Sequence, residues 1–283
     1  MIELEIDGTR VEVPEGTTIW EAARARGIEI PVLCHEPRMK PVGVCRVCVV
    51  DVGERVLAAS CVRACQRGMQ VRTATPEIEG HRRVLAELLL SDQPPAARDP
   101  KESTLGGNEL LSLARRTDAR AGRFPGGNGR PVDASSAVIA VDHQACILCD
   151  RCIRACDEIQ GNEVIGRSGK GYATRIAFDL DLPMGESSCV SCGECVAACP
   201  TGALVDKAIA SPLRPRGELK RVDSVCPYCG VGCALSYHVD EPIGASRSKA
   251  MRAPYPLPVR VSTSLHCRSS QPRMQRSQRM QAW

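Results

Sequence analysis

Aromatic side chains and long apolar runs are scarce in this 283-residue sequence. Trp, Tyr and Phe make up 3% of the chain, so large rings cannot dominate its core. No apolar run approaches about 18 residues, the length of a membrane span, and the start MIELEIDGTR lacks the basic and apolar regions of a secretory signal. We therefore expect a cytoplasmic protein without a membrane span, in which thiols stay reduced and a disulfide framework is disfavoured.

Acidic residues are missing from the C-terminal tail, residues 245–283, which contains eight Lys and Arg. Removing these eight from the total of 37 bases leaves 29 against 33 acids, so the net charge of +4 belongs to the tail. Because the rest of the chain has no basic excess, we expect no nucleic-acid partner.

Cysteine, in contrast, is abundant, with 17 residues of which 16 fall in four blocks. Residues 66–145 contain none, and Cys267 stands alone. In a reducing compartment, such blocks of cysteines indicate metal or cluster binding rather than disulfides.

Two of the blocks repeat one spacing. Cys146-x2-Cys149-x2-Cys152-x3-Cys156 recurs as Cys189-x2-Cys192-x2-Cys195-x3-Cys199, and only the second copy is followed by proline. This is the bacterial ferredoxin motif, in which the fourth cysteine ligates the other cluster. The sequence therefore predicts two [4Fe–4S] clusters with crossed ligands, one bound by Cys146, Cys149, Cys152 and Cys199, the other by Cys189, Cys192, Cys195 and Cys156. A zinc site fits two triplets and two crossed single cysteines poorly.

The first block, Cys34-x10-Cys45-x2-Cys48-x12-Cys61, supplies four thiols, which suit a [2Fe–2S] cluster. With its stretches GVCRVCVVDV and SCVRACQRGM, it resembles the β-grasp ferredoxin domain of complex I large iron–sulfur subunits, iron-only hydrogenases and NAD-linked formate dehydrogenases. The resemblance makes Cys61 the fourth ligand and leaves Cys65 as a small buried hydrophobic residue. A four-cysteine zinc knuckle is the alternative.

The last block, Cys226-x2-Cys229-x3-Cys233, resembles the first [4Fe–4S] motif of the molybdopterin oxidoreductase family, specifically formate dehydrogenase alpha subunits. A third [4Fe–4S] cluster would use these three thiols, with Cys267 as a distant candidate for the fourth ligand. A zinc or redox site is the alternative.

Three further positions bear on the ligand set. Related chains carry a histidine-ligated cluster after an LLLSD-type helix, but here Gln93 stands at the histidine position and no cysteine follows before Cys146. We therefore predict no cluster there. His81 is expected at the surface or in helix packing, and His35 is expected to tune hydrogen bonds in the loop beside Cys34.

Local patterns predict the elements that carry these motifs. Ile2, Leu4 and Ile6 alternate with polar residues before an Asp7-Gly8 turn, which indicates a hairpin. A capping box predicts a helix from Thr18 to about Gly27. Helices are also expected after Thr75-Pro76 and after Asn108, and a short strand at 138–141. The first of these helices should carry Val84, Leu85, Leu88 and Leu89 on one face.

The expected fold class is α+β in five parts. These are a β-grasp [2Fe–2S] domain (1–78), a helical connector and linker (79–136), a two-cluster [4Fe–4S] ferredoxin-like domain (137–210), the start of a molybdopterin-oxidoreductase [4Fe–4S] domain (219–243) and a disordered, low-complexity basic tail (244–283). The resemblance covers residues 1–243 and implies the electron-transfer arm of an NAD-dependent formate dehydrogenase alpha subunit.

In that family, single electrons pass between a Mo or W bis-pterin formate site and a flavin/NAD-binding diaphorase subunit. No pterin domain can be assigned here, so no catalytic residue is predicted, and we expect a reading frame that is truncated or shifted after the fourth motif. The alternatives are a diaphorase small subunit of an NAD-reducing hydrogenase, a fragment of the complex I subunit and, in another class, a zinc-stabilised interaction module.

Overall fold

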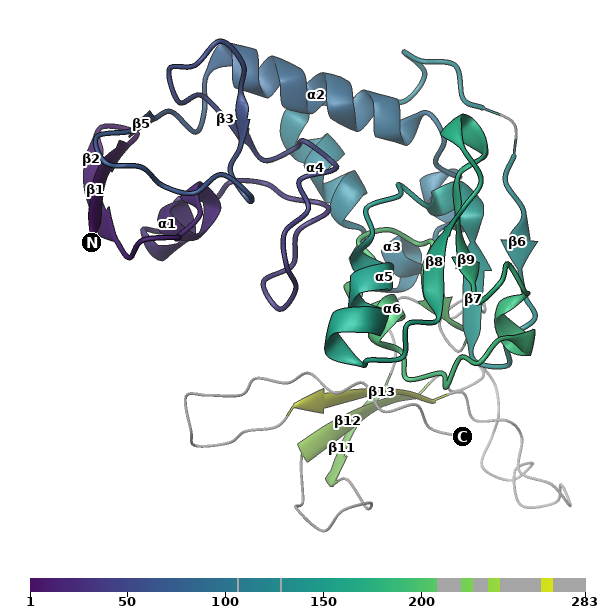
Figure 1. Ribbon diagram of the computed structural model, residues 1–283. Coiled ribbons are helices and arrows are strands. Elements are labelled where there is room, and N and C mark those ends of the chain that lie inside the picture. Colours follow the sequence, from purple (N-terminus) through teal and green to yellow (C-terminus); the bar gives the residue numbers. More distant parts are fainter. Residues whose placement is uncertain (106, 128, 208–219, 226–233, 240–260, 267–283) are drawn as a thin grey trace, which may run out of the picture.

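The computed structural model describes residues 1–105, 107–127, 129–207, 220–225, 234–239 and 261–266. A first unit (residues 1–75) and a second unit (residues 129–207) lie on either side of a helical connector (residues 76–127), and helix α2 (Pro76–Leu90) runs from one towards the other (Figure 1). No helix in these ranges is long and apolar enough to cross a membrane.

The first unit is a small sheet covered by one helix. Strands β1 (Ile2–Ile6) and β2 (Thr9–Val13) form the predicted hairpin, and β5 (Gln70–Val71) pairs with β1 in parallel. Helix α1 (Ile19–Ala25) begins at the predicted capping box, in which Thr18 and Glu21 bond reciprocally, and Gly27 follows its end at φ +76°. A second hairpin, β3 (Val49–Val50) and β4 (Ala58–Ala59), carries the cysteine loops.

The connector packs helix on helix. Helix α2 is followed by a 3-10 turn (Ala96–Arg98), α3 (Pro100–Leu105) and α4 (Glu109–Thr117). The side chain of Asn108 accepts a hydrogen bond from Leu111 N at 3.0 Å and caps α4 as predicted. A shared apolar cluster joins α2 and α4 to Leu33 and Val47 of the first unit.

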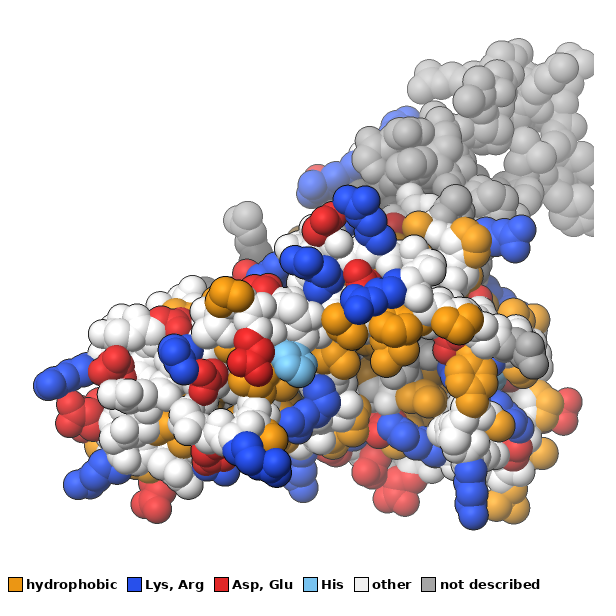
Figure 2. Space-filling model, turned by 90° about the horizontal axis from the view of Figure 1, so that it is seen from above, with side chains coloured by type: hydrophobic (Ala, Val, Ile, Leu, Met, Phe, Trp, Pro, Cys, Tyr) orange, Lys and Arg blue, Asp and Glu red, His pale blue; other side chains and the backbone are white. Residues whose placement is uncertain are grey.

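The apolar face predicted for α2 is covered only in part. Val84 and Leu88 are 37% and 50% exposed, whereas Ala86 and Leu90 are buried against α4. The apolar residues of this helix extend over more than one stripe, and tertiary contacts decide which of them is covered. Figure 2, seen from the α2 side, shows hydrophobic side chains gathered in the middle of the exposed face.

The second unit is built on the repeated cysteine motif. Its sheet has the order β10-β7-β6, from β6 (Val132–Asp133), β7 (Ile139–Asp142) and β10 (Leu204–Asp206), and β8 (Ile165–Ser168) and β9 (Arg175–Phe178) form a hairpin. Each motif leads into a short helix: α5 (Arg151–Arg154), which continues as a π-helical turn (Ala155–Ile159), and α6 (Glu194–Ala198). The two helices pack together over a core that contains several cysteines. Its apolar side chains include Ile139, Val141, Ile176, Phe178 and Leu204.

A third antiparallel sheet follows, with the order β11 (Lys220–Val225), β12 (Ala234–Val239) and β13 (Val261–His266). Strand β13 lies inside the tail that was expected to be disordered, so that expectation is wrong for residues 261–266. Its pairing with β12 supplies backbone partners, and the alternation of Val261, Thr263 and Leu265 is typical of a strand. The remaining tail residues are outside the described ranges.

Candidate iron–sulfur sites

The four cysteines of the predicted [2Fe–2S] site lie together, and we call them the first thiol group (Cys34, Cys45, Cys48 and Cys61). The backbone N–H of Cys45 donates to Cys34 Sγ at 3.5 Å, and the Sγ atoms of Cys48 and Cys61 are 3.4 Å apart. Cys65 is also buried, but burial and the nearby charge of Glu21, not another thiol, raise its pKa. The structure thus brings Cys61, not Cys65, to the other three.

Contacts within the first thiol group change the acidity of its members. The thiols of Cys45 and Cys61 lower the pKa of Cys34 to about 2, and the thiol of Cys61 lowers the pKa of Cys48 to about 7. The same contacts raise the pKa values of Cys45 and Cys61. Because the thiolate is the form that binds a metal, the lowered pKa values of Cys34 and Cys48 favour metal binding by these two thiols.

The second thiol group (Cys146, Cys149, Cys152 and Cys199) lines one narrow cavity. The remaining walls of this cavity are mostly apolar, and include Ile147, Ile176, Pro200 and Leu204. Burial raises the pKa of Cys146 to about 11, and the nearby charge of Cys199 adds to the rise. Four thiols from both copies of the motif therefore face one apolar space, and this donor set fits a [4Fe–4S] cluster.

The third thiol group (Cys156, Cys189, Cys192 and Cys195) combines the other triplet with the other single cysteine. Burial is the main reason that the pKa of Cys192 is raised, and the charges of Cys156 and Cys189 contribute. Cys156 and Cys195 are buried, whereas the Cys192 residue is exposed. The arrangement is the one expected from crossed ligands, and it reaches the protein surface.

Backbone geometry is the same in both triplet loops. Leu148 N donates to Cys146 Sγ at 3.5 Å, and Ser191 N donates to Cys189 Sγ at 3.4 Å. Leu148 and Ser191 have φ values of +52° and +53°. Each non-glycine residue in this left-handed region costs roughly 1–2 kcal/mol. The loops thus accept strain while they direct N–H groups at the thiol sulfurs.

Arg82 supports the first thiol group and was not predicted. Its side chain is buried on α2 and donates to three backbone carbonyl oxygens, those of Val47 (3.2 Å), Val49 (3.1 Å) and Thr73 (3.0 Å). It also pairs with Glu79 at 2.6 Å. A sequence signal existed, because Arg82 lies four residues from Ile78 and from Ala86, both of which are buried.

Among the described residues, no hydrogen bond is seen between a thiol and His35, His81 or Gln93. His81 is exposed, as expected. His35 is buried edge-on against Trp20, with ring centroids 4.6 Å apart, and its Nδ1 has no hydrogen-bond partner among the described residues, so its expected role in tuning hydrogen bonds is not seen at this atom. Gln93 Nε2 donates to Ala145 O at 3.1 Å and ties the connector to the second unit.

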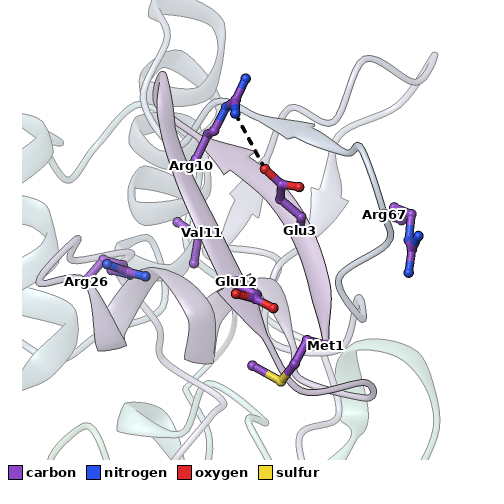
Figure 3. Close-up of a pocket in the computed structure, with 7 residues that line it drawn as sticks. All are labelled: Met1, Glu3, Arg10, Val11, Glu12, Arg26 and Arg67. Carbon is purple, nitrogen blue, oxygen red and sulfur yellow. Dashed lines mark ion pairs between the residues drawn. The ribbon is translucent and has the colours of Figure 1, made fainter.

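Other candidate positions lie elsewhere. Cys226, Cys229, Cys233 and Cys267 are outside the described residues. Within the described ranges, no three His, Cys, Asp or Glu side chains are arranged to hold a single metal ion. A groove of about 500 Å³ on the first unit is lined by Met1, Glu3, Arg10, Val11, Glu12, Arg26 and Arg67 (Figure 3). None of these seven residues was predicted to bind a cluster.

Known protein families match three parts of the chain. Residues 1–76 match a 2Fe-2S iron-sulfur cluster binding domain, residues 145–203 a 4Fe-4S dicluster domain and residues 219–250 the molybdopterin oxidoreductase Fe4S4 domain. The order of these matches along the chain is the order of the predicted cysteine motifs.

Several curated proteins are similar over most of this chain. A NADH-quinone oxidoreductase subunit of Rhizobium meliloti is 36% identical over 258 residues, which cover 89% of this chain and 29% of the relative. The NADP-reducing hydrogenase subunit HndD of Solidesulfovibrio fructosivorans is 37% identical, with 73% and 36% covered. The chain therefore spans about a third of the length of these relatives.

A solved structure matches over nearly its full length. A chain from the crystal structure of NAD+-reducing [NiFe]-hydrogenase in the H2-reduced state superposes with a TM-score of 0.69 and 31% identity, covering 76% of this chain and 91% of that one. The shared domains, fold and coverage show that this chain belongs to the family of iron–sulfur subunits that includes the matched chains of NADH-quinone oxidoreductase and of the [NiFe]-hydrogenase.

Proposed function

We propose that this chain relays single electrons between a flavin- and NAD-binding partner subunit and a second redox centre. The observation that carries the proposal is the cavity lined by Cys146, Cys149, Cys152 and Cys199, because it joins cysteines from both motifs around one apolar space. When bound there, an iron–sulfur cluster accepts and releases one electron at a time. The first and third thiol groups would extend the proposed path beyond this cavity.

The protein residues hold and insulate these sites. Thiolates of the three thiol groups would bind iron, and the N–H groups of Leu148 and Ser191 point at ligand sulfurs. Hydrogen bonds to sulfur and burial from water are the means by which a protein sets cluster potentials. Exposed Cys192 leaves the third thiol group open to a docking redox partner.

More specifically, we propose that this chain is the electron-transfer part of a formate dehydrogenase alpha subunit. Its support is the spacing Cys226-x2-Cys229-x3-Cys233 within the match to the molybdopterin oxidoreductase Fe4S4 domain. A third [4Fe–4S] cluster would use these thiols, and Cys267 remains the candidate for its fourth ligand. The Mo or W bis-pterin site would belong to a domain beyond this chain.

A second candidate is the diaphorase small subunit of an NAD-reducing hydrogenase. The matched hydrogenase chain favours it, because 91% of that chain is covered. The two candidates differ in their electron donor. Co-expression with the neighbouring genes, followed by assays of formate-dependent and H2-dependent NAD reduction, separates them.

Anaerobic reconstitution of the full chain tests the relay itself. We expect a brown protein with acid-labile sulfide and, after reduction, separate EPR signals from one [2Fe–2S] and at least two [4Fe–4S] clusters. Zinc without sulfide would overturn the relay and support the interaction module. Colourless protein that binds neither iron nor zinc would contradict both.

A further inference from the structure

Arg154 lies between the first and second thiol groups. It is 6% exposed, and its guanidinium donates to the carbonyl oxygen of Cys34 and, at 3.5 Å, to that of Cys149. A third bond, of 2.6 Å, reaches the carbonyl oxygen of Lys40. One buried side chain on α5 therefore contacts a ligand residue of each thiol group.

Further contacts fix residues 33–40 on the second unit. Met39 is buried against Ala155 and Ala198. Residues of the same segment make three further contacts. Arg151 donates a hydrogen bond to Leu33 O at 3.3 Å, Arg38 forms an ion pair with Glu194 at 3.1 Å, and Lys40 N donates a hydrogen bond to Glu158 at 2.8 Å. The segment between α1 and β3 thus reaches across to α5 (Figure 1). Arg154 is the member of this interface that touches both thiol groups.

Among the described residues Arg154 forms no ion pair, whereas neighbouring Arg151 pairs with Glu109 at 2.6 Å. The Nε atom of Arg154 also has no hydrogen-bond partner in the described part of the chain. A buried, unpaired cation is costly unless a negative group compensates it. Clusters bound by four thiolates are net negative, so the two proposed sites would supply that compensation.

We propose that Arg154 is the residue that couples the first two cluster sites, by holding the Cys34 loop against the Cys149 loop and by placing a positive charge between them. This inference rests on the proposed relay. A positive charge stabilises the reduced form of each cluster, because reduction adds negative charge, and it therefore raises both potentials. The hydrogen bonds keep the two sites at one separation.

Two variants and a matched control test the inference in the reconstituted full chain. Arg154→Gln removes both the positive charge and the guanidinium hydrogen bonds. Arg154→Lys keeps the charge but cannot donate to the carbonyl oxygens of Cys34 and Cys149 in the same geometry. The control is Arg167→Gln, because Arg167 donates to Leu148 O at 2.9 Å and pairs with Asp150, and so contacts only the loop of the second thiol group. The readouts are EPR-monitored reduction potentials and the magnetic interaction between the two reduced clusters.

We expect Arg154→Gln to lower both potentials and to weaken the magnetic interaction. Arg154→Lys should weaken the interaction with a smaller change in potential, and Arg167→Gln should leave the [2Fe–2S] potential unchanged. If Arg154→Gln kept the wild-type potentials and the wild-type magnetic interaction, the inference would be overturned. It would also be overturned if Arg167→Gln lowered the [2Fe–2S] potential and weakened the magnetic interaction as much as Arg154→Gln does. If the Gln variant does not load, an unchanged interaction in the Lys variant overturns it. A wild-type chain without iron and sulfide would instead refute the relay, and this inference with it.

Discussion

The Sγ atoms of Cys48 and Cys61 lie 3.4 Å apart, whereas for Cys65, four residues further on, burial and the nearby charge of Glu21 rather than another thiol raise the pKa. The two neighbouring cysteines therefore have different roles. We predict that Cys61→Ser abolishes the [2Fe–2S] EPR signal, because it removes a ligand. Cys65→Ala should keep that signal and lower the free energy of unfolding by on the order of 1 kcal/mol.

Reconstitution and urea unfolding of both variants check this assignment. A normal [2Fe–2S] signal in Cys61→Ser together with loss of the signal in Cys65→Ala would reverse it. The comparison is matched because both side chains are buried and belong to the same loop.

Crossed ligation predicts reciprocal damage in the second unit. Cys199→Ala should remove or convert the cluster held by Cys146, Cys149 and Cys152, because Cys199 lines their cavity. Cys156→Ala should affect the cluster of the other triplet instead. EPR spectra of the two variants, recorded beside the wild type, distinguish the clusters. If each substitution damaged the cluster of its own motif, the ligands would be uncrossed.

Arg82 should matter for stability although it touches no thiol. Arg82→Leu leaves the carbonyl oxygens of Val47, Val49 and Thr73 without their donor. A buried polar group without a partner costs roughly 1–3 kcal/mol, so we expect a loss of about 3 kcal/mol or more in the free energy of unfolding. His81→Leu, at an exposed position of the same helix, is the control for urea unfolding. Equal losses in the two variants would argue against this role.

Local signals predicted much of the fold and of the thiol groups. The capping box at Thr18 and Glu21 and the cap at Asn108 depend only on residues three apart, so they survive in the structure. The crossed thiol groups follow from spacing, because a two-residue gap leaves each triplet on one loop.

Long-range contacts could not be predicted in the same way. Arg154 meets Cys34 across 120 positions of sequence, and the covered face of α2 depends on α4. Strand β13 needs β12 as its partner, and composition alone indicated a disordered tail there. In each case the deciding partner is distant in the sequence, and local patterns carry no information about it.

His143 should make stability depend on pH. Burial, followed by the charge of Arg175, lowers its pKa in the folded state below the ordinary value of about 6.5. As pH falls through about 6.5, the unfolded chain gains a proton that the folded chain does not, so stability is lost towards acid and is retained above this range. We expect His143→Gln to flatten this part of the urea-unfolding profile, and His81→Gln, at an exposed position, is the control. An unchanged slope in His143→Gln would contradict the prediction.

Gly202 should tolerate no side chain, because it lies directly against the carboxylate of Asp99, which a Cβ would overlap. That carboxylate is buried and is held by Asn108 Nδ2 at 2.5 Å and by Lys101 N at 2.8 Å, so it cannot turn away without breaking these bonds within the connector. Overpacking of this kind costs typically about 1–3 kcal/mol. We therefore expect Gly202→Ala to lower the urea midpoint, whereas Gly166→Ala, where a Cβ meets nothing within 4 Å, should change it little. Equal midpoints for the two variants would show that the Asp99 contact is not rigid.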